Sequence, residues 1–508
     1  MIMRKRKVNE FTEYLNHLNA DDVQKVKAFM VNFKQHMNLP LSEEKKLRKD
    51  LKGALMYYNA IGVSVTEALR RLDNENLGGF YARPPLLYYA LDDAAKIYPL
   101  SMKHGFQAVF RLSANLYDEV VPQLLQIALT FTIKRFPRFA TTLKKGFFWH
   151  YLDANKQRYG IEKEEHLPCR PIKVATTGSK SFRVLYYKNR ISVEFFHSLT
   201  DGKGGIVFLQ TLLDTYLRLF GVEGHKHPSV LDINAAPVPE EDANEFKKTT
   251  VTKRSGFKEK RALQMSGKIE SIRPTQILHF RLDAKELAKT AKSYDVTITT
   301  YVLALILLAS RFATDAKEGD IAIQVPVDLR KYYESKTLAN FSLYGGIRIP
   351  ITSITTMEQL LPLVKEQLVT ATSHEKMSEM MYSAHRMNKD VRGFPLFLKS
   401  PIAKLAYGLM GEAIFTTTLS NLGVVSAPDY FSDYIESYDF VLGPPEVNRA
   451  ALTLITYNNI ATLTITKSTK DPSFEEEIHR LLTKDGLDIT IEGSAVYERK
   501  SRVSRKKY

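Results

Sequence analysis

The chain has 508 residues, of which 44% are hydrophobic and 11% aromatic, so it can fill large cores and is not a disordered polypeptide. Its single cysteine, Cys169, excludes an intramolecular disulfide and suits a reducing, cytoplasmic compartment. The net charge of +16 suits an anionic lipid, a phosphorylated co-substrate or an acidic protein, whereas no zinc spacing, RNA-binding signature or helix-turn-helix pattern points to a specific nucleic acid.

Residues 1–80 are predicted to form a helical N-terminal extension. Pro40 separates a first helical stretch from a second one within 43–73. The first stretch carries apolar residues at helical spacing: Val23, Val26, Met30, Phe33 and Met37. This stripe has three possible uses, which are docking onto the main body, dimerisation and contact with a membrane surface, and docking is the simplest of them.

A first half with mixed strands and helices is expected over residues 88–225. A strand is predicted over 106–113, followed by a long amphipathic helix over 115–135 that ends before Pro137.

A β-hairpin is predicted further along this half. The segments 181–187 and 191–197 are rich in β-branched and aromatic residues, and the three residues between them suit a turn. Because strand side chains alternate, His197 falls on the same face as the apolar residues Val193 and Phe195. The imidazole therefore ends an apolar row.

The second strand of this hairpin leads into a hexapeptide of the form His-x-x-x-Asp-Gly, His197-Ser198-Leu199-Thr200-Asp201-Gly202. Residues 206–220 then keep helical spacing, so the hexapeptide is a strand-to-helix corner with glycine where the backbone must bend. Such a corner holds side chains rigidly and still exposes them to a ligand. Read alone, a histidine at a strand end is more often structural than catalytic.

Residues 226–275 are poor in apolar periodicity and read as a linker that crosses to a second α/β half over 276–495. This second half is expected to open with a helix over 284–294. The apolar run 301–309 is about half as long as a membrane span and reads as a buried helix. The basic tail 496–508 is expected to fray.

Two segments of the second half add polar residues to the picture. The strand predicted over 321–330 delivers Arg330 to its end, where it can pair with a carboxylate. A strand over 416–423 runs into a polar turn that contains Ser420 and Asn421.

A closing hairpin is predicted around Asn458-Asn459, two residues suited to positive φ.

Together these motifs resemble the CoA-dependent acyltransferase superfamily, which includes chloramphenicol acetyltransferase and the condensation domains of peptide synthetases. The segment 89–99, Tyr-Ala-Leu-Asp-Asp-Ala-Ala-Lys-Ile-Tyr-Pro, resembles the start of the bacterial alcohol acetyltransferase branch. The resemblance covers about residues 88–495. Many members carry two adjacent histidines; here Phe196 stands in the first place, and His197 is the second, usually catalytic one.

The resemblance implies an α/β (α+β) fold. It consists of two chloramphenicol-acetyltransferase-like halves, each with a mixed sheet, around a central tunnel. The tunnel would admit acyl-CoA from one face and the acceptor from the other. No permanently bound cofactor and no metal are expected, and acyl-CoA, such as acetyl-CoA, would be the co-substrate.

The same resemblance gives the polar residues separate tasks. His197 would act as general base and take the proton from an acceptor hydroxyl or amine as it attacks the thioester. Asp201 would turn away from the substrate and pair with Arg330, while Gly202 would permit the turn. Ser420 and Asn421 are candidates for stabilising the oxyanion, the alternative being that they only form the turn.

A second class of function stays open. A non-catalytic or carrier-dependent, condensation-like protein would bind an acyl carrier protein or make peripheral contact with a lipid surface. The positive charge fits an acidic carrier as well as the phosphates of CoA, so it does not separate the two classes.

Overall fold

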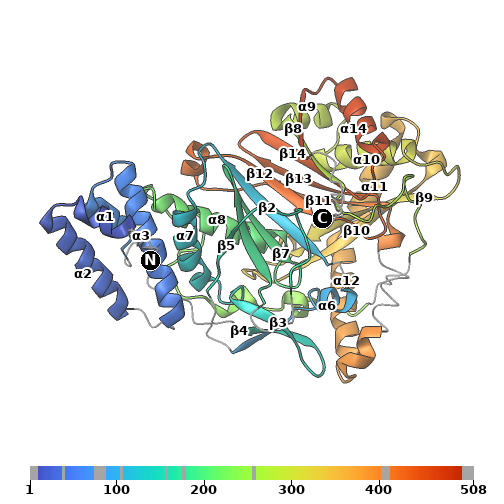
Figure 1. The fold of residues 1–508 in the computed structure, drawn as a ribbon. Coiled ribbons are helices and arrows are strands. Elements are labelled where there is room, and N and C mark those ends of the chain that lie inside the picture. Colours follow the sequence, from blue (N-terminus) through green and yellow to red (C-terminus); the bar gives the residue numbers. More distant parts are fainter. Residues whose placement is uncertain are drawn as a thin grey trace, which may run out of the picture.

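The computed structural model describes residues 10–36, 41–73, 87–102, 107–154, 158–173, 179–253, 259–401 and 412–494. A group of N-terminal helices lies beside a first α/β half, and a second α/β half packs on the other side of that first half (Figure 1). Both sheets of the two halves are covered by helices, as the expected α/β fold requires.

The N-terminal helices pack onto the first half. They are α1 (Glu10–Asn16), α2 (Ala20–His36), α3 (Leu41–Ala60) and α4 (Val65–Arg71). Helix α3 contacts α7 (Pro122–Arg135), and Val26, Met30 and Phe33 of α2 belong to the same buried core as the first half. The Tyr58 hydroxyl donates a 2.5 Å hydrogen bond to the carbonyl of Leu219. Helix α2 packs mainly against α4, so its apolar stripe is buried within the N-terminal helices, and α3 makes the contact with the first half. Docking of the stripe itself onto the main body stays a prediction.

The first half is built on a five-stranded sheet in the order β12-β2-β7-β6-β5. Its strands are β2 (Val109–Leu116), β5 (Ile161–Lys163), β6 (Phe182–Tyr187), β7 (Arg190–Phe196) and β12 (Ile435–Leu442). Helices α7 and α8 (Gly202–Arg218) cover one face, where Phe208 of α8 packs edge-on against Phe195 of β7. The predicted β6–β7 hairpin is confirmed, with Lys188 at φ 48° in its turn.

The prediction of one long helix over 115–135 is wrong in its first part. Strand β2 continues to Leu116, whose N–H bonds the carbonyl of Asn189 at 2.8 Å. Helix α7 begins only at Pro122, which occupies the first turn at no cost because its missing N–H would have no partner inside the helix.

The second half is built on a seven-stranded mixed sheet in the order β10-β9-β11-β13-β14-β8-β15. Its strands are β8 (Gln276–Asp283), β9 (Asp320–Asp328), β10 (Ser342–Pro350), β11 (Thr417–Val424), β13 (Ala450–Tyr457), β14 (Ile460–Lys467) and β15 (Ile489–Gly493). Its helices are α9 (Ala284–Ser293), α10 (Ile298–Phe312), α11 (Met357–Ala371), α12 (His374–Asp390) and α14 (Ser473–Lys484). The closing hairpin β13–β14 is confirmed, with Asn458 and Asn459 at φ 47° and 64°.

Helix α10 is the buried helix predicted from its apolar run. Its residues from Thr300 to Leu307 are all buried, between α11, α14 and the sheet. Among the described residues no single helix is long and apolar enough to cross a membrane; α9 and α10 reach that length only as a pair bent by 80°.

A small three-stranded sheet lies below the two halves in Figure 1. It has the order β1-β4-β3 and consists of β1 (Tyr88–Ala90), β3 (Thr141–Lys145) and β4 (His150–Ala154). The short helix α6 (Ile97–Ser101) follows β1 in the chain.

One strand crosses between the halves. Strand β12 lies inside the range 276–495 by sequence, but it pairs antiparallel with β2 of the first half, from Ile435 opposite Leu116 to Leu442 opposite Phe110. Asp439 of β12 also forms a 3.0 Å ion pair with Arg281 of β8. The two halves are therefore joined by a strand that comes from the second half in sequence and pairs in the sheet of the first.

The segment 226–275 contains two short 3₁₀ helices, η1 (Pro239–Asp242) and η2 (Glu245–Lys248). The Glu241 carboxylate forms a bidentate ion pair with the guanidinium of Arg135 of α7, with N–O distances of 2.7 and 2.6 Å. Its carbonyl accepts a 2.7 Å bond from the N–H of Leu338 in the second half. The linker therefore joins the two halves close to the hexapeptide.

Candidate active site

The imidazole of His197 is held at the end of β7 by two rings and its own backbone. The backbone N–H of His197 donates to the carbonyl of Ala108 at 2.8 Å. The ring stacks on Tyr98 with centroids 4.5 Å apart and an interplanar angle of 20°, and it meets Phe110 edge-on at 5.1 Å. These contacts fix the plane of the imidazole while the residue stays partly exposed.

A chain of hydrogen bonds orients the ring within that plane. Nδ1 of His197 lies 2.9 Å from Oδ1 of Asn340, which comes from the second half. The backbone N–H and the side-chain amide of Asn340 both donate to Oδ2 of Asp92, at 3.2 and 3.4 Å. Asp92 is buried and forms a 3.3 Å ion pair with the buried Arg138. Neither Asp92 nor Asn340 was among the expected site residues.

This arrangement selects one tautomer of His197. Because the Asn340 amide nitrogen faces Asp92, its oxygen faces the ring, so the proton belongs on Nδ1. Nε2 is then left as the basic nitrogen, and the hydrogen bonds of the described residues give it no partner. Burial lowers the pKa of His197 below its ordinary value, although a hydrogen bond with its own backbone, the charge of Asp201 and the bond with Asn340 act in the other direction. The imidazole is therefore neutral near pH 7.

The Asp201 carboxylate faces three hydrogen-bond donors and not the imidazole. It is the N-cap of α8 and accepts from the Gly204 N–H at 3.0 Å, from the Phe341 N–H at 2.8 Å and from Nη1 of Arg330 at 2.9 Å. Burial alone would raise the pKa of this carboxyl, but the Arg330 guanidinium and the two backbone donors outweigh it and lower that pKa. The ion pair expected between Asp201 and Arg330 is present.

Arg330 ties the same corner to the second half. Its guanidinium also bonds Asp328 at 2.8 Å, the Thr337 carbonyl at 2.9 Å and the Ala339 carbonyl at 3.0 Å. It thus contacts Asp201 of the hexapeptide and two carbonyls just before Asn340. The guanidinium therefore fixes the hexapeptide and the Asn340 segment relative to each other.

Gly202 is covered by the polar turn of the second half. A Cβ atom at Gly202 would lie 2.7 Å from Cδ2 of Leu422, so a larger residue here would require the Leu422 side chain to shift. Leu422 sits at a bulge where the pairing of β11 with β13 shifts between Asn421 and Gly423. The Ser-Asn-Leu-Gly turn and the start of α8 are thus neighbours.

The structure separates the two oxyanion candidates. Asn421 is occupied by its own turn, because its Oδ1 accepts from the Gly423 N–H at 2.7 Å and its Nδ2 donates to Oγ1 of Thr299 at 3.0 Å. Ser420 lies beside Thr453 in the sheet, on the face opposite the buried Leu419. The Thr453 hydroxyl donates to the Phe440 carbonyl of β12, so this face looks toward the first half.

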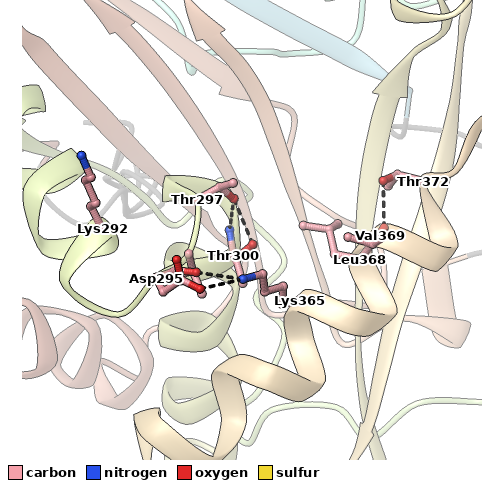
Figure 2. Close-up of a pocket in the computed structure, with 9 residues that line it drawn as sticks. Lys292, Asp295, Thr297, Thr300, Lys365, Leu368, Val369 and Thr372 are labelled. Carbon is pink, nitrogen blue, oxygen red and sulfur yellow. Dashed lines mark hydrogen bonds and ion pairs between the residues drawn. The ribbon is translucent and has the colours of Figure 1, made fainter.

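A cavity of about 350 Å³ opens in the second half between α9, α10 and α11 (Figure 2). Lys292 and Lys365 line it together with the hydroxyls of Thr297 and Thr300. Lys365 forms a 3.1 Å ion pair with the fully exposed Asp295. The cavity adjoins the residue that Asn421 binds, Thr299.

No cluster of metal-ligand side chains is found in the part of the chain that the structure describes. There, no group of three or more His, Cys, Asp or Glu side chains is placed to hold a metal ion. His150, which lies in an aromatic cluster, is buried, and burial lowers its pKa to about 4.

Comparison with known proteins was informative only at the level of structure. No family model matches the chain, and no curated protein matches its sequence. The first condensation domain of the calcium-dependent antibiotic synthetase superposes with a TM-score of 0.55 and 11% identity, over 80% of this chain and 100% of that one. TRI101 of Fusarium sporotrichioides, solved with coenzyme A and T-2, gives the same TM-score, identity and coverage.

A third solved structure is the TRI3 trichothecene 15-O-acetyltransferase of Fusarium sporotrichioides. It superposes with a TM-score of 0.51 and 14% identity, over 78% of this chain and 94% of that one. Since all these identities are low, the likeness is one of fold. The chain has the mixed α/β fold that condensation domains share with CoA-dependent acyltransferases.

Proposed function

We propose that this chain is a CoA-dependent acyltransferase that moves an acyl group from acyl-CoA to a hydroxyl, or an amine, of a small acceptor. The observation that carries the proposal is the fixed tautomer of His197, whose Nδ1 is bound to Asn340 and whose Nε2 is left to accept a proton. The fold shared with proteins solved in complex with CoA supports the same reading.

The reaction needs one base and no covalent intermediate. Nε2 of His197 takes the proton of the acceptor hydroxyl as the oxygen attacks the thioester carbonyl carbon, which forms the new C–O bond. The carbonyl π electrons move onto oxygen and give a tetrahedral oxyanion. When this collapses, the C–S bond breaks, and the imidazolium returns its proton to the thiolate, so that free CoA and the ester leave.

The oxyanion requires a donor, and we assign this task to Ser420. Its position on the interior face of β11 supports the assignment, whereas Asn421 supports the turn that carries it. Asp201, Gly202 and Arg330 do not touch the substrate in this scheme and act as positioning residues.

The donor is expected to lay its nucleotide end in the cavity of Figure 2. Lys292 and Lys365 supply positive charge for phosphate groups there, and the threonine hydroxyls supply donors. Acetyl-CoA and a small alcohol, as in the alcohol acetyltransferase branch, are the first pair to test. The central tunnel between the halves stays a prediction.

An acyl carrier protein is the alternative donor, and the likeness to a condensation domain supports it. Both donors present the same thioester to the same base. They differ in the surface of this protein that each donor would have to bind, so the assay should compare acyl-CoA with an acyl-loaded carrier protein.

The test is thiol release from acetyl-CoA in the presence of a panel of alcohols and amines, for the wild type, His197→Ala and a control. The exposed His479 of α14 gives the matched control, His479→Ala. We expect His197→Ala to lose turnover by about 10²- to 10⁴-fold with an unchanged unfolding temperature, and the control to match the wild type. Near-normal turnover by a folded His197→Ala variant would contradict the mechanism.

A further inference from the structure

Four of the five exposed phenylalanines of the described residues gather at one place on the surface. Phe147 and Phe148, at the tip of the β3–β4 hairpin, are 67% and 45% exposed, and Phe394 and Phe397, after α12, are 57% and 69% exposed. Leu398 is a further exposed apolar side chain of the second segment. We call these five residues the aromatic face. The β3–β4 hairpin lies at the lower edge of the molecule in Figure 1.

The two segments form one structured unit. The Leu396 N–H donates to the Phe147 carbonyl at 2.8 Å, and Nζ of Lys399 donates to the Phe148 carbonyl at 2.9 Å. The Lys399 ammonium also sits 3.7 Å from the centre of the Trp149 ring. These contacts join residues up to 251 positions apart and satisfy the polar groups at the base, while the phenylalanine rings are exposed to solvent.

The rings stand among positive charges. The stretches 144–151 and 389–399 contain five basic side chains, Lys144, Lys145, Lys389, Arg392 and Lys399, and a single acid, Asp390. Of these five, Lys144 pairs with Asp153 and Lys399 is buried. Lys145, Lys389 and Arg392 are exposed. Apolar rings surrounded by lysine and arginine are typical of proteins that bind the interface of an anionic membrane.

We propose that the aromatic face binds the surface of an anionic lipid bilayer. The phenylalanine rings enter the boundary between headgroups and acyl chains, and the surrounding cations contact the lipid phosphates. A second copy of this chain is the weaker occupant, because a symmetric dimer would bring the same positive charges face to face. This inference does not depend on the proposed enzymatic activity.

The test is co-sedimentation of the full chain with vesicles of phosphatidylcholine, alone or mixed with phosphatidylglycerol. The first variant is the double change Phe147→Ser and Phe397→Ser. Its control is Phe312→Ser, which removes a ring that is 64% exposed at the end of α10. A second variant, Lys145→Glu with Arg392→Glu, reverses the charge and leaves the rings in place.

We expect the wild type and the control to bind the mixed vesicles, and the ring variant to bind about tenfold more weakly. The charge variant should lose the preference for phosphatidylglycerol. Because all the changed side chains are exposed, each variant should keep the unfolding temperature of the wild type.

Two results would overturn the inference. One is that the wild type and the ring variant sediment equally with the vesicles, which includes the case in which neither binds them. The other is a dimer of the wild type in sedimentation velocity that dissociates in the ring variant without any vesicle binding, since this would assign the face to a second copy of the chain.

Discussion

Nδ1 of His197 lies 2.9 Å from Oδ1 of Asn340, although the two residues are 143 positions apart and belong to opposite halves. The side chain that orients the proposed base therefore comes from the half that does not contain it. A change that shifts one half relative to the other would therefore alter the orientation of the imidazole, even where it leaves the substrate contacts unchanged.

Asn340→Ala is expected to lower kcat by about 10²-fold, because the ring loses the acceptor that keeps its proton on Nδ1. The bond with Asn340 raises the pKa of His197, so its loss should also move the acid limb of the pH–rate profile to lower pH. Steady-state kinetics over a pH series measures both effects. Asn234→Ala, at an exposed site in the linker, is the control. A drop in kcat without a shifted profile would argue for a merely structural role.

The pH dependence of the wild type follows from the direction of the His197 shift. Burial lowers its pKa from 6.5, so kcat/KM should rise with pH, with a midpoint below 6.5, and stay level above it. The unfolded chain binds this proton at a higher pH than the folded one, so the contribution to stability falls as pH drops through 6.5. An acid limb above that value would mean that another group controls the rate.

Asp201→Asn should cost stability and activity together. It leaves Arg330 with a weaker partner inside the protein, and breaking a buried pair costs about 3–5 kcal/mol. Asp328→Asn is the matched control, because Asp328 contacts the same guanidinium but its side chain is 36% exposed. Urea unfolding at pH 7 compares the two variants. Since the pKa of Asp201 is lowered by folding, its contribution is present above its unfolded pKa and disappears as pH falls through the folded one.

Gly202→Ala tests the contact between the hexapeptide and the polar turn. Its new Cβ would meet Leu422 at 2.7 Å, so we expect reduced kcat in the single variant. Adding Leu422→Ala removes the obstructing methyl groups and should restore part of the activity. If the double variant is no better than Gly202→Ala, the loss comes from the backbone of α8 and not from this contact.

The double variant Lys292→Ala and Lys365→Ala tests whether the cavity of Figure 2 binds the nucleotide of CoA. Loss of two partly solvated charge contacts should raise KM for acyl-CoA by about 10-fold and leave kcat unchanged. Lys289→Ala, on an exposed face of α9, is the control. An unchanged KM for acyl-CoA would exclude this cavity as the nucleotide site, while an activity with carrier-bound acyl groups would point to the other donor.

Local patterns predicted most of the elements. The β6–β7 and β13–β14 hairpins, α8 and α10 were all expected, because strand alternation, turn residues and helical spacing are properties of neighbouring residues. The start of α7 was missed, since Asn115 and Leu116 are held in β2 by pairing with Arg190 and by a bond to Asn189, far along the chain. The pairing of β12 with β2 was missed for the same reason.

The candidate site shows the same division. The pair of Asp201 with Arg330 was expected from a resemblance between motifs, and it is present at 2.9 Å. The roles of Asp92, Asn340 and Tyr98 around His197 were not expected, because nothing in a single sequence reports that the segment 89–99 and the segment around Asn340 meet at this ring. The only available signals were the position of Asp92 and Tyr98 in the segment 89–99 and that of Asn340 shortly after Arg330. The catalytic role of His197 and the oxyanion role of Ser420 stay predictions.

The strand that crosses between the halves has a consequence for synthesis of the chain. Strand β2 has β7 on one side and β12 on the other, and the latter ends at Leu442. A ribosome must therefore add more than 300 residues after β2 before that edge of the sheet finds its neighbour. Until then the nascent first half displays an open, apolar edge, which is the kind of surface that chaperones shield and that promotes aggregation. Truncated chains that end before β12 should for this reason accumulate as insoluble protein.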